Sequence, residues 1–267
     1  MDLAFIQKKW INNMAKDTTA SIQAWDSVAN DYIYDDTTRL ESDPFLLFLQ
    51  EKLQLTKQMQ VLDVGCGAGA YCVALSNKVG HVTGTDFSPE MLKVGQRYVE
   101  ANSIKNVDFL ERNWWECSGD EFYKKYDLVF AHTTPAIADY STLLKMMKAS
   151  KHYCAICKPA RRTDEVSDAI RTLAGCSTEK SDDSIAYAFD TIWGHGYNPE
   201  IAYHETVWKS QKPIDEAVVW YLNRLKGSCH IDAHTEQNVI DYLKDISMDG
   251  IVNETIRTTL VSMIWEV

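Results

Sequence analysis

The sequence has few of the features that mark membrane, secreted or nucleic-acid-binding proteins. No uncharged apolar run in its 267 residues approaches the roughly 20 residues that a spanning helix needs. Its first residues, MDLAFIQKKWINNMAK, contain no apolar stretch followed by a small-residue cleavage site. Only 27 residues are basic against 38 acidic ones, a formal net charge of −11, so the surface should repel polyanions. We therefore expect a cytoplasmic protein with neither a membrane nor a nucleic acid as its partner.

Cysteine is too scarce for a disulfide scaffold. The seven cysteines, at positions 66, 72, 117, 154, 157, 176 and 229, are an odd number. A chain with 45% hydrophobic residues can build its core without disulfides. Cys154 and Cys157 form a CxxC pair, but HYCAIC is typical of a buried strand, in which these two side chains point to opposite faces. We expect reduced thiols and no metal site.

Strand and helix patterns alternate through the middle of the chain. Strands are predicted at 61–65, 81–86, 107–111, 126–131 and 152–158, and helices at 69–79, 88–102, 118–124 and 138–149. Ser88 and Pro89 suit the cap and first position of the second of these helices. This alternation indicates an α/β fold with a parallel sheet that helices cover on both faces.

The two ends of the chain follow other patterns. The first 50 residues look helical, and PFLLFLQEKLQL at 44–55 is an amphipathic helix. Helices are predicted near 164–173, 181–193, 213–227 and 235–246, with strands at 199–210 and in the last 17 residues. Because no linker is evident, we predict one domain over 1–267. It would have an N-terminal helical lid (1–55), a cofactor-binding core (56–160), and cap helices with closing strands (161–267).

The stretch VLDVGCGAGAYCVAL places a glycine turn between a strand and a helix. Gly65, Gly67 and Gly69 allow a tight turn and leave the backbone open to a ligand. Dinucleotide sites use G-x-G-x-x-G, whereas the spacing here is G-x-G-x-G. No basic residue in the loop could neutralise a phosphate, and Asp63 could bind a cationic group. The turn therefore favours a ligand without phosphate.

Two further strand ends carry polar groups that suit a nucleoside. Asp86 ends GTD, where a carboxylate can accept hydrogen bonds from both ribose hydroxyls, a feature that fits NAD equally well. The side-chain carbonyl of Asn113 could accept from an adenine amino group, and the backbone N–H of Trp114 could reach a ring nitrogen. Phe87 offers an apolar face for the adenine.

At this point the sequence resembles the class I S-adenosylmethionine-dependent methyltransferases, in particular the small-molecule enzymes related to ubiquinone and menaquinone methyltransferases. The resemblance covers residues 25–160 and rests on WDSVANDY, VLDVGCGAGAYCVAL, VTGTDFSPEML, FLERNWWE, YDLVFAHTTPAI and HYCAICKP, which occur in the expected order. It implies a Rossmann-like sheet of seven strands, of which the last runs antiparallel. Asn113 stands where family members commonly have Asp, and HTTPAI lacks the signature of enzymes that methylate nucleobase amines.

The resemblance also implies which residues hold the cofactor, S-adenosylmethionine, or its product S-adenosylhomocysteine. The implied set is Tyr32, Asp63, Gly65, Cys66, Gly67, Asp86, Phe87, Met91, Asn113, Trp114 and Ala131. For the acceptor, we expect an aromatic lid from Trp25, Tyr34, Trp193, His195 and Tyr197, although these residues could equally pack on the sheet.

Methyl transfer from a sulfonium is an in-line displacement, so positioning can supply much of the catalysis. An acceptor that must lose a proton would use a base, and His132 just past the fourth strand is the candidate. His132 could instead be a polar wall residue. We predict methyl transfer to a small-molecule acceptor. The alternatives are a catalytically silent cofactor-binding module, a tRNA methyltransferase and an NAD-dependent oxidoreductase.

Overall fold

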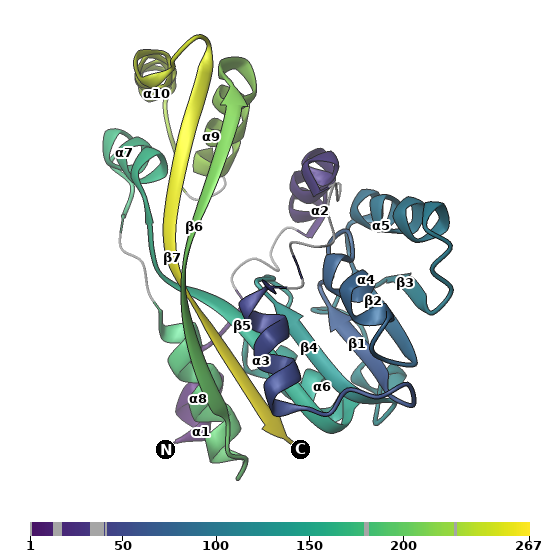
Figure 1. Cartoon of the computed structure of the whole chain (residues 1–267). Helices are drawn as coiled ribbons and strands as arrows, with labels where there is room; N and C mark the ends of the chain where they lie inside the picture. The colour runs from purple at the N-terminus through teal and green to yellow at the C-terminus, as the bar shows by residue number, and fades with distance from the viewer. Residues whose placement is uncertain (1, 13–17, 33–39, 41, 179–181, 227–228) are drawn as a thin grey trace. The chain divides into compact units, whose positions relative to one another are not determined.

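A computed structural model of the protein describes residues 2–12, 18–32, 40, 42–178, 182–226 and 229–267. The chain divides into two units (Figure 1). The first comprises Met1–Lys158, Asp183–Tyr203 and Val261–Val267, and the second comprises Pro159–Asp182 and His204–Leu260. In the described residues, no helix is both long enough and apolar enough to cross a membrane. The single domain expected over 1–267 stays a prediction.

Seven strands form one sheet in the order β3-β2-β1-β4-β5-β7-β6. Their bounds are β1 Gln60–Val64, β2 His81–Asp86, β3 Val107–Glu111, β4 Tyr126–His132, β5 Ser150–Asp164, β6 Glu200–Pro213 and β7 Ile251–Glu266. The pairs among β1 to β5 are parallel. This confirms the mostly parallel sheet of seven strands.

Strand β7 runs against its neighbours. The Val267 N–H donates to the His152 carbonyl, and the Thr258 hydroxyl donates to the Ala160 carbonyl. Strand β7 therefore runs in the direction opposite to β5. Ser210 and Gln211 of β6 likewise pair with Glu254 and Asn253. The last strand is thus antiparallel to both neighbours, as the resemblance implied.

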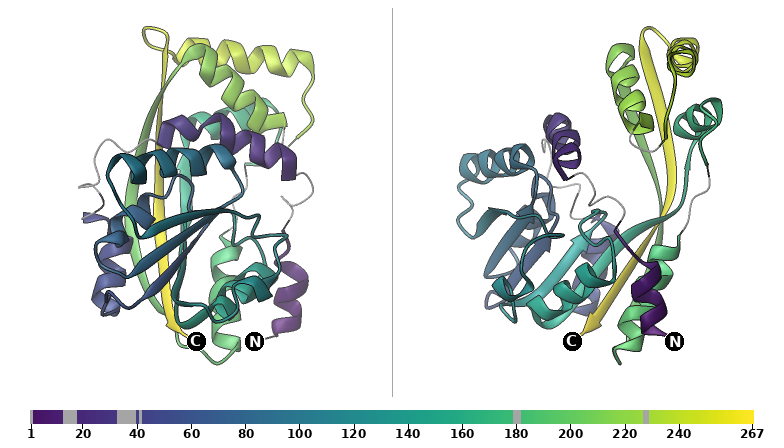
Figure 2. Two further views of the ribbon diagram at one scale, coloured as in Figure 1. Left: turned by 90° about the vertical axis from the view of Figure 1, so that its right-hand side faces the viewer. Right: turned by 180° about the vertical axis from the view of Figure 1, so that it is seen from behind.

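Helices cover both faces of the sheet in the first unit (Figure 2). Their bounds are α1 Leu3–Lys9, α2 Thr18–Ser27, the short 3₁₀ helix η2 Ala29–Tyr32, α3 Pro44–Lys52, α4 Ala70–Ser76, α5 Pro89–Ala101, the 3₁₀ helix η4 Gly119–Glu121, α6 Tyr140–Ala149 and α8 Asp183–Gly194. The strand order extends from β1 to one side through β2 and from β4 to the other through β5. Right-handed crossovers then place α4 and α5 on one face and α6 on the other. Helices α1 and α8 pack with α6.

Local sequence signals explain where these helices begin and end. The Ser88 hydroxyl accepts from the Met91 N–H at 3.2 Å and Pro89 is the first residue of α5, as predicted. Helix α4 ends at Ser76, three residues before the predicted end. The Gly80 N–H donates to the Met59 carbonyl, so the chain has already turned toward β2.

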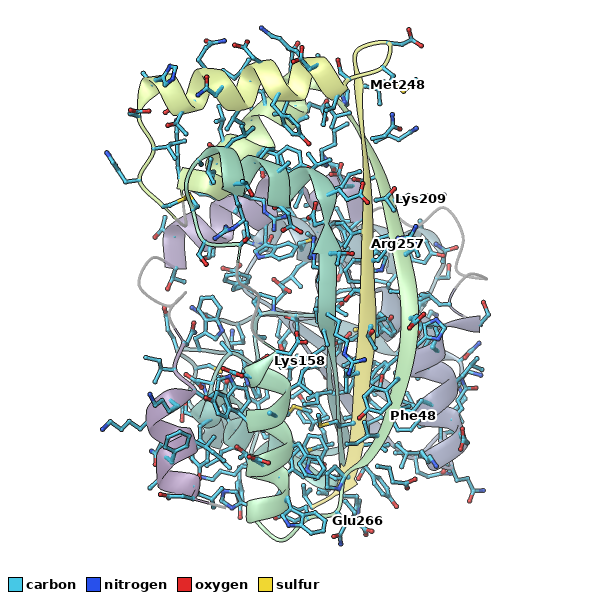
Figure 3. All side chains as sticks on the ribbon, turned by 90° about the vertical axis from the view of Figure 1, so that its left-hand side faces the viewer. Phe48, Lys158, Lys209, Met248, Arg257 and Glu266 are labelled. Atoms are coloured by element: carbon cyan, nitrogen blue, oxygen red, sulfur yellow. A yellow bond between two sulfur atoms is a disulfide. The ribbon has the colours of Figure 1, made fainter. Side chains whose placement is uncertain are left out.

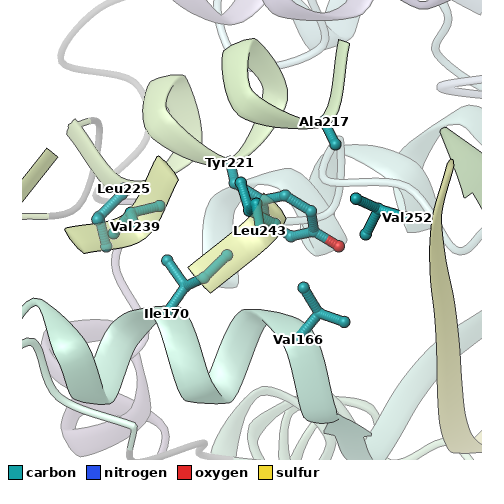
Figure 4. Close-up of a cluster of buried hydrophobic side chains, with 8 residues drawn as sticks. All are labelled: Val166, Ile170, Ala217, Tyr221, Leu225, Val239, Leu243 and Val252. Carbon is teal, nitrogen blue, oxygen red and sulfur yellow. The ribbon is translucent and has the colours of Figure 1, made fainter. Parts of the chain in front are cut away.

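The second unit has its own core, built from α7 Glu165–Leu173, α9 Ile214–Lys226 and α10 Ala233–Ile246. Figure 4 shows the buried side chains between these helices pointing toward one another. They are Val166, Ile170, Ala217, Tyr221, Leu225, Val239, Leu243 and Val252. The Tyr221 hydroxyl donates to the buried carboxylate of Glu254 at 2.5 Å, so this core includes a satisfied polar pair.

A disulfide joins Cys176 and Cys229 within the second unit. The expectation that all seven cysteines are reduced was therefore wrong. The two residues lie just past the ends of α7 and α9, whose packing brings them together although they are 53 positions apart. Cys154 and Cys157 are free and buried in β5, as expected.

The sixteen residues of β7 change character along their length. Up to Leu260 the side chains alternate in burial, and from Val261 to Trp265 every residue is buried. Figure 3 labels Arg257 and Glu266 on this strand, both of which are exposed. The alternating part belongs to the second unit and the continuously buried part to the first, where helices cover both faces of the sheet.

Candidate functional site

A cavity lies at the carboxyl ends of β1, β2 and β4 in the first unit. Its volume is about 700 Å³, counting the open solvent in its mouth. Between β1 and β4 the strand order reverses, and ligands bind open α/β sheets at such a switch point. The lining residues are Trp25, Tyr32, Gly65, Cys66, Gly67, Ala68, Ala70, Tyr71, Asp86, Phe87, Met91, His132, Thr133, Thr134 and Pro135.

The glycine loop forms one wall of this cavity. Gly67 has φ +55°, and a Cβ added there would meet only the Met91 sulfur, at 4.0 Å. A Cβ on Gly65 would overlap the side chain of Thr134. Gly65 is therefore needed for packing, whereas Gly67 leaves its backbone open to a ligand. The Gly67 N–H donates to Asp86 Oδ2 at 2.8 Å, which ties the loop to the end of β2.

Asp86 lies where the cavity meets a second, smaller one. It is 7% exposed, and its Oδ1 accepts from the Ser88 N–H at 2.9 Å. Burial raises the pKa of its carboxyl group, while these backbone hydrogen bonds oppose the rise. A carboxylate has about four acceptor positions, so each oxygen of Asp86 can still accept from a ligand hydroxyl.

The second cavity follows the end of β3. Its lining residues are Gly65, Asp86, Phe87, Arg112, Asn113, Trp114, Trp115, Thr134, Pro135 and Ala136. Asn113 Oδ1 accepts from the Trp115 N–H at 3.1 Å, and Asn113 Nδ2 is buried with no hydrogen-bond partner in the described part of the chain. Asn113 therefore offers a ligand an unused donor, Nδ2, and the second acceptor position of Oδ1. The predicted hydrogen bond from an adenine amino group stays a prediction.

Trp115, which the sequence did not single out, pairs with Phe87 in this cavity. Their ring centroids are 5.6 Å apart. Trp114 is 3% exposed and its Nε1 donates to the Thr142 carbonyl at 3.2 Å. The indole of Trp114 is therefore part of the core, and the aromatic wall comes from Phe87 and Trp115.

The N-terminal segment contributes Trp25 and Tyr32, with ring centroids 6.3 Å apart. Asp26, next to Trp25, accepts from the Ser88 hydroxyl at 2.5 Å and from the Glu90 N–H at 3.3 Å. These bonds fix α2 on the start of α5. Tyr34 lies outside the described residues.

His132 lines the cavity with both ring nitrogens engaged. Nε2 is 3.0 Å from the Tyr71 hydroxyl, and Nδ1 is 3.1 Å from the Thr133 hydroxyl. Burial lowers the pKa of His132 to about 3, so the ring is neutral at physiological pH. Its role as a base stays a prediction.

Asp63 and Ala131 are not among the residues that line either cavity. Asp63 is 2% exposed and accepts from the Cys72 thiol at 3.4 Å. Burial raises the pKa of Asp63 to about 8, and the neighbouring charge of Asp86 adds to this. Cofactor contacts from Asp63 and Ala131 stay predictions.

The structure does not bring Trp193, His195 and Tyr197 to either cavity. They lie at the end of α8, which packs with α1 and α6. The His195 Nε2 pairs with the Tyr140 hydroxyl at 3.0 Å, and Gly194 packs against Leu3. The aromatic lid suggested for these three residues stays a prediction.

Several lining residues were missed in the sequence. Tyr71 stands in the first turn of α4, two positions after Gly69, and Thr133, Thr134 and Pro135 directly follow β4. The available signal was their position, because side chains at the carboxyl ends of parallel strands and in the following helix turn share one edge of the sheet.

Comparison with known protein families identifies a methyltransferase domain over residues 55–204, more than half of the chain. The chain belongs to this family. Together with the fold, this assigns it to the class I S-adenosylmethionine-dependent methyltransferases and decides against the NAD-dependent oxidoreductase alternative.

Two curated methyltransferases match the central part of the chain. Release factor glutamine methyltransferase from Fusobacterium nucleatum is 31% identical over 109 residues, 38% of this chain and 30% of that protein. Demethylmenaquinone methyltransferase from Geobacillus kaustophilus is 32% identical over 103 residues, 37% of this chain and 43% of that protein. The matched stretch spans less than half of these relatives. The crystal structure of the YcgJ protein from Bacillus subtilis shares the fold, with a TM-score of 0.50 and 17% identity over 82% of this chain and 97% of that one.

The residues of this methyltransferase fit the cofactor that its family implies. S-adenosylmethionine carries ribose hydroxyls, an adenine and a charged amino acid part. Asp86 has acceptor capacity left for hydroxyls, and the unpartnered Asn113 Nδ2 can donate to a ring nitrogen. Phe87 and Trp115 supply aromatic faces, and Gly67 leaves its backbone open. Polar and apolar groups therefore match the ligand at separate points of the two cavities.

Proposed function

We propose that this methyltransferase transfers the methyl group of S-adenosylmethionine to a small-molecule acceptor. The observation that carries the proposal is that a single cavity is lined both by the residues suited to the cofactor and by further side chains beside them. The cavity that Gly67 and Asp86 line also reaches Trp25, Tyr71 and His132. Cofactor and acceptor would then share one partly enclosed space, as an in-line displacement requires.

The chain's own residues would bind and orient the cofactor. Asp86 would accept from the ribose hydroxyls, and Asn113, Phe87 and the backbone at Trp114 would hold the adenine. The loop from Gly65 to Gly67, with Met91 and Tyr32 beside it, would hold the aminocarboxypropyl part. S-adenosylmethionine supplies a methyl group already activated on a sulfonium. The protein therefore has to place the acceptor in line and exclude water.

The lining of the larger cavity constrains the acceptor. It includes four aromatic side chains and no lysine or arginine among the described residues. An acceptor with a carboxylate or phosphate would lose its hydration there without gaining a lysine or arginine partner from this lining. A partly apolar small molecule without a carboxylate or phosphate fits better. The cytoplasmic location stays a prediction. The relatives are named for a protein substrate in one case and for a quinone in the other.

The test separates small-molecule from protein acceptors. A cell extract is divided by molecular size, and each part is incubated with the protein and methyl-labelled S-adenosylmethionine. We expect labelled small molecules that disappear with Asp86→Ala and remain with Asp108→Ala, which changes an exposed carboxylate on β3. Label confined to the protein part would contradict the small-molecule acceptor. Cofactor binding with no label in either part would support the catalytically silent module.

A further inference from the structure

Four polar side chains form one chain of hydrogen bonds that ends at the cavity wall. Asp43 Oδ1 caps α3 by accepting from the Phe45 and Leu46 N–H groups, both at 3.0 Å. Its Oδ2 accepts from the Tyr71 hydroxyl at 3.0 Å. From there the chain continues through His132 to Thr133.

Because Asp43 caps α3, the direction of every hydrogen bond between these four side chains is determined. The Asp43 carboxylate accepts from two backbone N–H groups of α3 and has no proton to donate. The Tyr71 hydroxyl therefore donates its single proton to Asp43 Oδ2. The 3.0 Å contact between the Tyr71 oxygen and His132 Nε2 then requires a proton on Nε2. In a neutral imidazole the other nitrogen is an acceptor, so the Thr133 hydroxyl donates to Nδ1. Having given away its proton, the Thr133 oxygen can only accept from a ligand.

Packing holds this arrangement in place. The His132 ring centroid lies 4.2 Å from that of Tyr71 and 5.0 Å from that of Phe45. Burial lowers the pKa of His132, which keeps the ring neutral. Thr133 has φ +45°, a strained conformation for a β-branched residue, and its N–H donates to the Cys157 carbonyl at 2.8 Å. Such strain is typical of residues that a site requires in one orientation.

We propose that Asp43, Tyr71 and His132 are positioning residues that make Thr133 an obligate hydrogen-bond acceptor, and that the acceptor substrate therefore presents an uncharged N–H or O–H group to it. The substrate class is then an amine or hydroxyl compound with an apolar body. This second part rests on the proposed function, because it assumes that the acceptor occupies the cavity. The proton arrangement itself does not depend on any ligand.

Nitrogen NMR of protein with isotope-labelled histidine tests the proton arrangement directly, because the two neutral tautomers have distinct spectra. The His132 signal is assigned by its loss in His132→Gln. We expect the tautomer with the proton on Nε2. A proton on Nδ1, or a charged ring at neutral pH, would overturn the proposal.

If the proposal holds, Asp43→Asn reverses the direction of the hydrogen bonds from residue 43 through Tyr71 and His132 to Thr133. The asparagine oxygen keeps the cap of α3, and its amide group then donates to the Tyr71 oxygen. Tyr71 must donate to Nε2, and His132 changes to the tautomer with the proton on Nδ1. Asp232→Asn is the control, since Asp232 caps α10 in the same way. An unchanged His132 tautomer in Asp43→Asn would contradict the proposal that Asp43 determines the direction of these hydrogen bonds. Should that variant fail to fold, Tyr71→Phe removes the partner of Nε2 and is expected to give a mixture of tautomers.

The substrate class is tested with para-fluorophenol and para-fluoroanisole, which differ in the hydroxyl donor. Their binding to protein saturated with S-adenosylhomocysteine is followed by fluorine NMR at millimolar concentration. We expect the phenol to bind roughly two- to tenfold more tightly, as one hydrogen bond would give. Thr133→Ser should keep this preference and Thr133→Val should abolish it. No preference in the native protein, including no binding by either compound, would overturn the substrate class. Failure of S-adenosylhomocysteine to bind would instead contradict the proposed function.

Discussion

Asp86 is the one carboxylate among the described residues that line the two cavities. Because it would accept from both ribose hydroxyls, Asp86→Ala should weaken binding of S-adenosylhomocysteine by about 1–3 kcal/mol, the cost of leaving buried donors unpaired. Calorimetric titration measures the change. Asp108→Ala is the control, and its dissociation constant should equal that of the native protein. An unchanged constant in Asp86→Ala would place the ribose elsewhere.

Asp63 should make the stability of the cofactor-free protein depend on pH. Burial raises its pKa from 3.8 to about 8. Between these values the folded state binds more protons than the unfolded state, so the contribution of Asp63 to stability falls as the pH rises. Asp63→Asn should therefore flatten the decline in the free energy of unfolding between about pH 5 and pH 8, measured by urea denaturation. Asp108→Asn should leave the slope unchanged, and an equal slope in Asp63→Asn would show that Asp63 is ionised in the folded protein.

Residues at strand ends were predictable because their position follows from the hydrophobic pattern. Gly65, Gly67, Asp86 and Phe87 all line the cavities. The orientation of a side chain was not predictable. Asn113 turns its carbonyl toward the Trp115 N–H, which depends on the local turn of the backbone after β3.

At the scale of elements, the loop between β1 and α4 can be tested through one glycine. Gly67→Ala should weaken S-adenosylhomocysteine binding at least tenfold, because the added Cβ would project into the cavity and occupy space that the ligand needs. It should also cost about 1–2 kcal/mol of stability, since φ is positive. Gly196→Ala is a matched control: its φ is +88°, and nothing lies within 4 Å of the added Cβ. That variant should lose similar stability and keep its affinity. Equal affinity in both variants would show that the ligand does not approach Gly67.

The alternation of strands and helices was read correctly, because buried parallel strands and amphipathic helices have distinct patterns. Packing between helices left no comparable trace. Helix α8 exposes Trp193, which the sequence suggested as part of a lid, and it packs with α1 and α6. The packing of α8 on α1 brings Gly194 beside Leu3, and no local sequence pattern indicates this contact.

For the molecule as a whole, the disulfide predicts that the second unit depends on oxidation. Cys176 and Cys229 close a loop with a sequence separation of 53, and a link of this size typically contributes about 2–4 kcal/mol. Cys176→Ser should lower the free energy of unfolding by this amount, while Cys117→Ser, which removes a free thiol, should not. A thiol titration of the unreduced, denatured protein provides the check. Seven reactive thiols would contradict the disulfide, whereas five are expected.

The division into two units was not predictable from composition. The chain passes between the units at four points, and three of these lie inside strands β5, β6 and β7. The change appears instead in β7, where alternating burial gives way to continuous burial at Val261. Such a change can be read only once the partners of the strand are known.

The most direct measurement is calorimetric titration of the purified protein with S-adenosylhomocysteine. We predict binding in the micromolar range at one site per chain, with no heat from NADH under the same conditions. Absence of binding by S-adenosylhomocysteine would contradict the central claim, because the cavity at the ends of β1, β2 and β4 would then belong to a methyltransferase fold that no longer holds its cofactor.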